Sequence, residues 1–326
     1  MKKYLHFCIR PLTVFTLFLI LFCQNDALAQ IQTDDSRKGV LSDQMLDTRS
    51  LSMAGSTIAD FYGGGPSIGI NAALSGLIHN PTFIQFNSNH NWDSNVMQHH
   101  LTLPTLANGP HHFTAQFGLF QQGIENLPFT NPPTLPVPDV TIYRAELAYA
   151  IAFSDYFSIG TLQSISYVTT REEAQYWNYF ADIGLVYAPD GSISYGLIFR
   201  GLGHQTAYEI IETGQTTLGS RLAQQSIEIG ATLRYPVEEN KTYLSISFSN
   251  EKRFGETGMW YKTGIEIFSA SVISLRGGVM VNFDQSLFIP RTGLGIDAGM
   301  FKIDYMIAPK NLIGEQFHQI GLTIQF

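Results

Sequence analysis

The chain ends on Phe317-His-Gln-Ile-Gly-Leu-Thr-Ile-Gln-Phe326, a stretch in which apolar and polar side chains alternate. On a β-strand, Ile320, Leu322, Ile324 and Phe326 point to one face, and the residues between them point to the other. Alternation of this kind is typical of any strand with one apolar environment and one polar environment. The stretch therefore predicts a closing strand whose apolar face carries an aromatic side chain at its last position.

The opposite end of the chain predicts export. A basic start precedes an apolar run from Leu12 to Phe22, and Ala27-Leu28-Ala29 provides the small residues of a signal-peptidase site. The apolar run is shorter than the roughly 20 residues that a transmembrane helix needs. The bulky Phe22 before Cys23 argues against a lipoprotein. We therefore expect a signal peptide over residues 1–29, cleaved after Ala29.

The composition leaves a globular exported protein or a membrane barrel, and favours the barrel. Both cysteines lie inside the expected signal peptide, which excludes disulfides, thiolate metal sites and cysteine nucleophiles from the mature chain. Charged residues make up only 14% of the chain while aromatic residues make up 13%, a balance that favours a barrel with an apolar, aromatic-girdled outer face. The net charge of −8 argues against a nucleic-acid partner, which requires a basic surface.

Segments of alternating polarity recur from residue 82 to the end of the chain and number fourteen. Each has about the 9–11 residues of a tilted membrane strand. The even-numbered connections are short and most odd-numbered ones are longer, as expected when both ends of a barrel lie on the same side of a membrane. We predict a transmembrane antiparallel β-barrel of about 14 strands over 82–326, with strands at 82–89, 97–103, 111–120, 141–153, 157–168, 179–187, 192–201, 224–235, 241–250, 259–268, 271–281, 291–298, 300–307 and 317–326.

The same alternation sorts charged side chains onto the inner face. In 141–153, Tyr143 and Leu147 point outward while Arg144 and Glu146 point inward. An ionised side chain on the lipid face costs about 2–4 kcal/mol at mid-depth, so this sorting supports the register. Equal numbers of each sign favour a paired network that fills the lumen over a permeation path lined by charge, which is the alternative. The predicted lumen charges are Arg144, Glu146, Asp182, Arg200, Glu228, Arg234, Lys262, Glu266, Arg276, Asp297, Lys302 and Asp304.

Residues 30–81 lack strand alternation and are rich in glycine and small side chains. Within them, Thr48–Asp60 (T-R-S-L-S-M-A-G-S-T-I-A-D) resembles the N-terminal motif of the long-chain fatty-acid transporter superfamily, especially its PorV/PorQ-like branch. Gly69–Gly76 (G-I-N-A-A-L-S-G) is similar to the Asn-Pro-Ala segment of that branch, with Ala72 in place of the proline. The stretch from Asp304 to Gln319 resembles the last hairpin of the superfamily.

The resemblance implies a 14-stranded monomeric barrel whose segment 30–81 folds inward as a hatch or plug. In the PorV/PorQ-like branch the barrel is a component of the type IX secretion system and contacts secretion proteins or secreted cargo. Short outer loops favour this function. The alternative is a passive uptake channel for hydrophobic small molecules such as fatty acids.

The closing strand also carries a resemblance, to the C-terminal signal that the outer-membrane assembly machinery reads. Its apolar residues Ile320, Leu322, Ile324 and Phe326 match that signal. We therefore expect the protein in the bacterial outer membrane, with outer-membrane lipid as its surroundings.

The expected hatch contains one candidate hinge. Gly63, Gly64 and Gly65 precede Pro66, and Asn71 is the polar residue of the second motif. A hinge would let the segment move, whereas glycine more often supplies a turn where side chains do not fit.

Other candidate sites favour structural roles. His99-His100 and His111-His112 lie on neighbouring strands, and polar rim positions explain them better than a zinc site. The five prolines of 121–140 predict a stiff, extended lid that touches a ligand or partner, or covers the barrel mouth. Trp92, Trp177 and Trp260 are expected in the interfacial girdle. Without a nucleophile elbow, phosphate loop or metalloprotease motif, we expect no catalysis, cofactor or metal.

Overall fold

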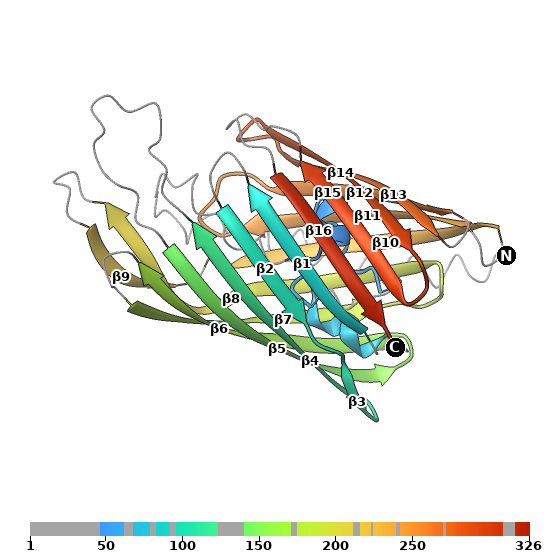
Figure 1. Ribbon diagram of the computed structural model, residues 1–326, viewed down its shortest axis with the longest axis horizontal. Helices are drawn as coiled ribbons and strands as arrows, with labels where there is room; N and C mark the ends of the chain where they lie inside the picture. The colour runs from blue at the N-terminus through green and yellow to red at the C-terminus, as the bar shows by residue number, and fades with distance from the viewer. Residues whose placement is uncertain are drawn as a thin grey trace.

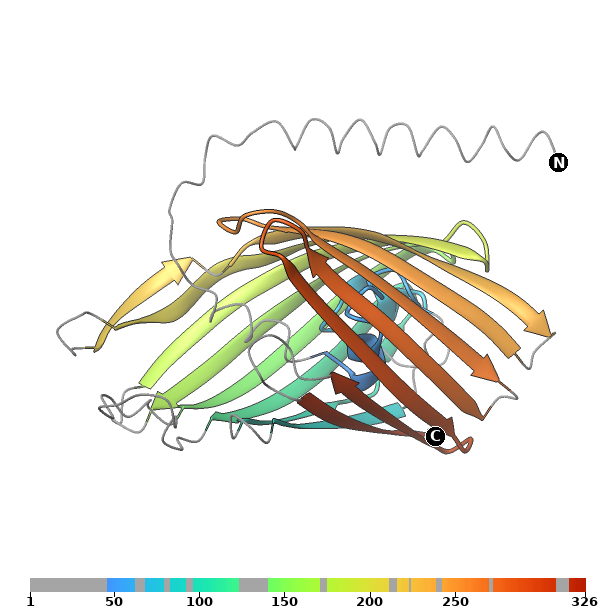
Figure 2. The same ribbon diagram turned by 90° about the horizontal axis from the view of Figure 1, so that it is seen from above.

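The computed structural model forms one antiparallel sheet that closes on itself around a short helical segment (Figure 1, Figure 2). The expected signal peptide, Gly63–Gly65, Trp92 and most of the proline-rich 121–140 lie outside the residues that the structure describes. Those described are 46–61, 68–78, 83–91, 96–122, 140–170, 175–210, 216–222, 224–238, 242–269, 272–308 and 317–326.

Two short helices precede the strands, α2 (Thr48–Ser52) and the 3₁₀ helix η2 (Ala72–Gly76). Neither is long and apolar enough to cross a membrane. The strands are β1 (Phe83–Asn91), β2 (Val96–Thr102), β3 (Leu106–Asn108), β4 (His111–Gln122), β5 (Val140–Ser154), β6 (Phe157–Thr170), β7 (Gln175–Tyr187), β8 (Ile193–Ile210), β9 (Thr216–Leu222), β10 (Ser226–Glu238), β11 (Thr242–Arg253), β12 (Trp260–Ser269), β13 (Ile273–Asn282), β14 (Leu287–Asp297), β15 (Phe301–Ala308) and β16 (Phe317–Gln325).

Fourteen of these strands form the closed ring, which confirms the predicted barrel and its strand number. Consecutive ring strands pair antiparallel, and the ring closes where β16 pairs with β1. The two remaining strands lie off the ring. β3 pairs only with β4, and β9 pairs with the far end of β8 in a hairpin that projects beyond the barrel (Figure 2).

Two strands begin four residues earlier than predicted, β7 at Gln175 instead of residue 179 and β14 at Leu287 instead of residue 291. The added part of β14 contains Pro290, which cannot donate to a sheet ladder. In the structure β14 begins at Leu287, and Pro290 pairs with Val279 of β13. The described pairing with β15 begins only at Thr292, so Pro290 has a described strand neighbour on one side alone. The connection between β13 and β14 is consequently shorter than expected.

Apolar side chains cover the outside of the barrel. Tyr143, Leu147, Ile183 and Ile265 are all exposed, while polar or small residues between them face inward. Aromatic rings continue across strands, with Tyr167 packed against both Tyr143 and Trp177. The outer surface therefore has the character of a surface in contact with hydrocarbon.

Trp260 corrects the expected aromatic girdle. Its side chain is only 6% exposed and faces the lumen, where it packs with Ala54 and Met280. The indole Nε1 donates to Glu256 Oε2 at 3.0 Å, and the Arg253 guanidinium lies 5.2 Å from the centre of the ring. A polar partner for the indole and a cation over its face stabilise the inward orientation.

Candidate functional site

The lumen holds residues 46–61 and 68–78, named here the luminal segment (Figure 1). Its first helix, α2, begins at Asp47, whose side chain accepts hydrogen bonds from Ser50 N at 2.9 Å and Ser50 Oγ at 2.6 Å. This is N-terminal capping by an aspartate. Ala54 and Gly55 then adopt positive φ angles of 58° and 71°, which end the helix and turn the chain back.

Asn71 joins the two parts of the luminal segment to the barrel wall. Its side chain caps η2 by accepting from Ala73 N at 3.1 Å, and its Nδ2 donates to Ile58 O at 2.9 Å and to Leu185 O of β7 at 3.3 Å. Ala72 occupies the first helical position, where proline is favoured because its φ is already helical. Here the Asn71 side chain, rather than a proline ring, holds the start of the turn.

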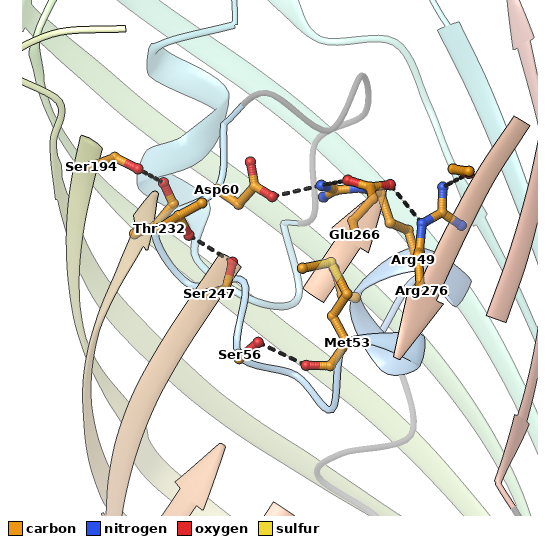
Figure 3. A network of polar contacts seen from close by, with 12 residues as sticks. Arg49, Met53, Ser56, Asp60, Ser194, Thr232, Ser247, Glu266 and Arg276 are labelled. Atoms are coloured by element: carbon orange, nitrogen blue, oxygen red, sulfur yellow. Dashed lines mark hydrogen bonds and ion pairs between the residues drawn. The ribbon is translucent and has the colours of Figure 1, made fainter. Parts of the chain in front are cut away.

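A buried ion network anchors the luminal segment to the wall (Figure 3). Arg49 of α2 bonds to Asp60 at 2.6 Å and to Glu266 of β12 at 2.5 Å. Glu266 also accepts from Arg276 Nε at 2.7 Å, and Arg276 Nη1 reaches Asp304 at 2.6 Å. Each of these five residues is at most 5% exposed. We call them the Arg49 network.

The charge state of Arg49 follows from these contacts. Burial lowers the pKa of the Arg49 guanidinium, but the carboxylates of Asp60 and Glu266 outweigh this effect and raise the pKa well above its ordinary value. Arg49 is therefore a cation at neutral pH.

A second group of charges surrounds Glu228 on β10. Lys262 Nζ lies 3.1 Å from its carboxylate, Arg200 Nη2 lies 3.3 Å away, and Ser249 Oγ donates at 2.6 Å. Arg200 also donates to the carbonyl oxygens of Gly69 at 3.1 Å and Ile70 at 2.7 Å, so this group also contacts the luminal segment.

Two members of this second group were not expected from the sequence. Glu251 lies 2.9 Å from Lys262, and Arg253 lies 3.2 Å from Glu251. The predicted strand ends at residue 250, whereas β11 continues through Arg253. Ser245, Ser247 and Ser249 face inward at every second position, and Glu251 and Arg253 continue that alternation. This pattern could have predicted that both charges face the lumen.

The other expected lumen charges have different partners, and Asp182 adjoins the group around Glu228 through Arg200. Arg144 and Glu146 lie 3.7 Å apart on β5, and Asp182 lies 3.8 Å from Arg200. Arg234 lies 3.8 Å over the Tyr243 ring. Asp297 accepts from Gly299 N at 2.9 Å in the β14–β15 turn and is the register partner of Lys302.

Seven glycines of the wall face the luminal segment at short range. A Cβ atom added at any of them would lie within 2.7 Å of a luminal-segment atom, closer than real Cβ atoms approach their neighbours. At Gly160, Gly196, Gly264 and Gly278 the segment's backbone itself lies against the glycine, and at the other three a side chain of the segment fills the place of a Cβ, an approach that only glycine permits. The sequence feature that could have predicted this contact is the presence of glycines at inward positions of strands with alternating polarity. We name this set the glycine belt: Gly160, Gly184, Gly196, Gly264, Gly278, Gly293 and Gly321.

The four histidines considered as metal ligands do not converge. His99 faces outward and stacks on Phe86, and His111 faces outward beside Tyr149. His100 and His112 face inward, but His100 is opposite Gly118, so the two lie roughly 20 Å apart along β4 at about 3.3 Å per residue. Among the described residues there is no group of three or more His, Cys, Asp or Glu able to hold a metal ion.

Comparisons with known proteins identify the fold. No family model matches the sequence, and no curated protein matches it. The toluene transporter TbuX of Ralstonia pickettii superposes with a TM-score of 0.56 at 13% identity, covering 86% of this chain and 98% of that one. A deltaS2S3 mutant of the monoaromatic hydrocarbon channel TodX gives 0.59 at 10% identity, and a Pseudomonas aeruginosa FadL homologue gives 0.55 at 10%, both with the same coverage. The chain thus has the 14-stranded barrel fold of these proteins.

Proposed function

We propose that this chain is a non-enzymatic outer-membrane β-barrel that lets hydrophobic small molecules cross, with the luminal segment as its hatch. The observation that carries the proposal is a barrel with an apolar outer face and a lumen occupied by its own N-terminal segment. The similar folds of a toluene transporter and a monoaromatic hydrocarbon channel support it. Of the two functions considered from the sequence, uptake is the better supported.

Among the described residues, the pairing of β1 with β2 runs as far as Gln85 and Thr102, and β3 beyond it pairs with β4. We propose this edge of the wall as the exit for an apolar solute. Leu106 of β3 is among the most exposed apolar residues. A hydrophobic molecule that leaves the barrel here enters hydrocarbon directly and avoids the cost of returning to water.

The test is uptake of radiolabelled toluene by a Gram-negative host that lacks its own hydrophobic-uptake barrels. Cells that carry the chain should accumulate toluene faster than cells that carry an unrelated closed barrel at equal surface level. Equal rates would refute the uptake function.

A disulfide lock tests the hatch separately. Thr48 Oγ1 lies 2.9 Å from Asn87 Oδ1 of β1, and the mature chain has no other cysteine, so Thr48→Cys/Asn87→Cys joins the luminal segment to the wall. Oxidised cells should lose uptake and reduced cells should regain it, while each single variant is insensitive to oxidation. Full uptake by the oxidised pair would show that α2 need not move.

The second candidate is a component of the type IX secretion system. It is supported by the PorV/PorQ-like motif at Thr48–Asp60 and by the many contacts that hold the luminal segment, which suit a barrel that stays closed and anchors a partner. Gentle affinity isolation from native outer membranes followed by mass spectrometry distinguishes the two. Stoichiometric recovery of a large translocon subunit or secreted cargo favours secretion, and recovery of the barrel alone favours uptake.

A further inference from the structure

One row of inward-facing side chains crosses six neighbouring strands of the wall. Gln319 of β16 pairs in register with Asn89 of β1, and Asn89 pairs with Gln98 of β2. Gln98 in turn pairs with Phe120 of β4. The row continues from Phe120 to Ile142 and Val168. Each member is at most 9% exposed. We name these six residues the amphipathic row, because three amides are followed without a break by three apolar side chains.

The amide half has hydrogen-bonding atoms without partners. Both side-chain polar atoms of Asn89 are buried and unbonded, as are Gln98 Oε1 and Gln319 Oε1. Gln319 Nε2 donates to Leu46 O at 3.0 Å, which fixes the orientation of its amide. A buried polar group without a hydrogen-bond partner is unfavourable, and native proteins keep few of them. Three adjacent amides in this state offer hydrogen bonds to a bound molecule, and because the row is covered in this structure, binding requires the residues that cover it to move aside.

The apolar half is one packed cluster. Phe120, Ile142 and Val168 are in contact, and half-buried Val140 packs against them. Cross-strand partners have Cβ atoms about 5 Å apart, so Phe120 directly adjoins the amide of Gln98. A molecule of modest length that lies along the row therefore reaches both halves.

The amphipathic row contains no ionisable side chain. The nearest charge on its apolar strands is Arg144, two residues from Ile142, and this cation is directed to Glu146 and lies 5.2 Å from the centre of the Phe180 ring. The Arg49 network and the charges around Glu228 lie on the luminal segment and on other strands, β8, β10 to β13 and β15. On the amide strands the inward-facing ionisable side chain is His100, two residues from Gln98. An ionic head group would lose its hydration here without gaining a counter-charge.

We infer that the amphipathic row binds an uncharged amphiphile, such as a fatty alcohol or an alkylphenol, whose head donates a hydrogen bond. Three of the four unbonded atoms are acceptor oxygens, so a hydroxyl or N–H head satisfies them better than an ether or a carboxylate does. The alkyl or aryl part of the ligand lies over Phe120, Ile142 and Val168. The inference deepens the proposed uptake function by naming the solute class, and it rests on that function for its biological meaning.

The test is equilibrium binding to the full chain in nanodiscs with four radiolabelled probes of one tail length: dodecanol, dodecyl methyl ether, dodecanoate and dodecane. Dodecanol should bind at least tenfold more tightly than the other three. Asn89→Leu/Gln98→Leu should reduce dodecanol binding at least tenfold, to the level of the ether, and leave dodecane unchanged. Gln163→Leu makes the same chemical change on the outer face and should have no effect.

The outcomes separate the two proposals. Equal affinity for all four probes, no binding at all, or the same dodecanol affinity in Asn89→Leu/Gln98→Leu overturns the inference, even when toluene uptake is normal. Selective dodecanol binding in a protein that fails the toluene uptake test supports the site and refutes hydrocarbon uptake. A thermal melt of each variant in the same nanodiscs shows that the barrel is folded, and removal of unbonded amides should not lower its midpoint.

Discussion

Replacing Arg49 with methionine is expected to release the luminal segment while the barrel stays folded. Methionine keeps most of the side-chain volume but removes the cation that bonds Asp60 and Glu266. Both carboxylates remain buried with one fewer cation, and removal of one partner from a buried ion pair costs about 3–5 kcal/mol. The strand ladders do not depend on Arg49, so this cost falls on the docked state of the luminal segment.

The expected increase in the undocked fraction of the luminal segment follows from the relation between free energy and an equilibrium constant. Since about 1.4 kcal/mol corresponds to a tenfold change in an equilibrium constant, the loss raises the undocked fraction roughly 100- to 5,000-fold. Single-channel recording of Arg49→Met in planar bilayers should therefore show openings far more often than the parent. The thermal unfolding of the barrel should change little.

A compensated variant separates charge from packing. Arg49→Met/Asp60→Asn/Glu266→Gln removes the cation together with two carboxylates and leaves Arg276 paired with Asp304 at 2.6 Å. Because no uncompensated charge remains, its open probability should return most of the way to the parent value. If Arg49→Met stays within threefold of the parent, or if the triple variant opens as often as Arg49→Met, charge pairing does not hold the segment.

Three further substitutions test the register and the docking surface. Leu197→Arg adds a charge beside outward-facing Leu185 and Ile229 and should destabilise the inserted barrel by about 2–4 kcal/mol. The measurement is the band of folded barrel that membranes give on an unheated gel, which should be lost. Normal insertion would mean that the register is wrong. Gly278→Ala places a Cβ 2.5 Å from Met53 C and should increase channel openings, whereas Gly277→Ala, with its nearest neighbour at 3.9 Å, should not. Asn71→Leu removes a helix cap worth about 1 kcal/mol and should speed proteolysis of the luminal segment, and an unchanged cleavage rate would contradict the capping role.

Strand number and register were predictable because the barrel exposes every strand to two different surroundings. Each outward residue meets an apolar medium and each inward residue meets a polar lumen, so a period of two appears in the sequence. Boundaries were less certain where alternation and local chemistry disagreed. β14 begins four residues before the predicted start and contains Pro290, which cannot donate to a sheet, and β11 continues past its predicted end through the charged Glu251 and Arg253.

The docking of the luminal segment was not predictable in the same way. Arg49 and Asp60 stand in an aperiodic stretch, and their meeting with Glu266 depends on how that stretch folds inside the barrel. The glycine belt has no hydropathy signal, because glycine is neutral in any such pattern. Trp260 begins its strand, where parity is least certain, and its inward direction depends on Arg253 and Glu256.

The glycine belt has a consequence for the order in which the protein assembles. The luminal segment lies directly against wall glycines on β6, β7, β8, β12, β13, β14 and β16, so little space remains for threading the segment into a finished ring. The seam between β1 and β16 joins the first and last strands of the chain. We therefore expect the strands to assemble around an N-terminal segment that is already in place. The pairing of β1 with β16 then forms last.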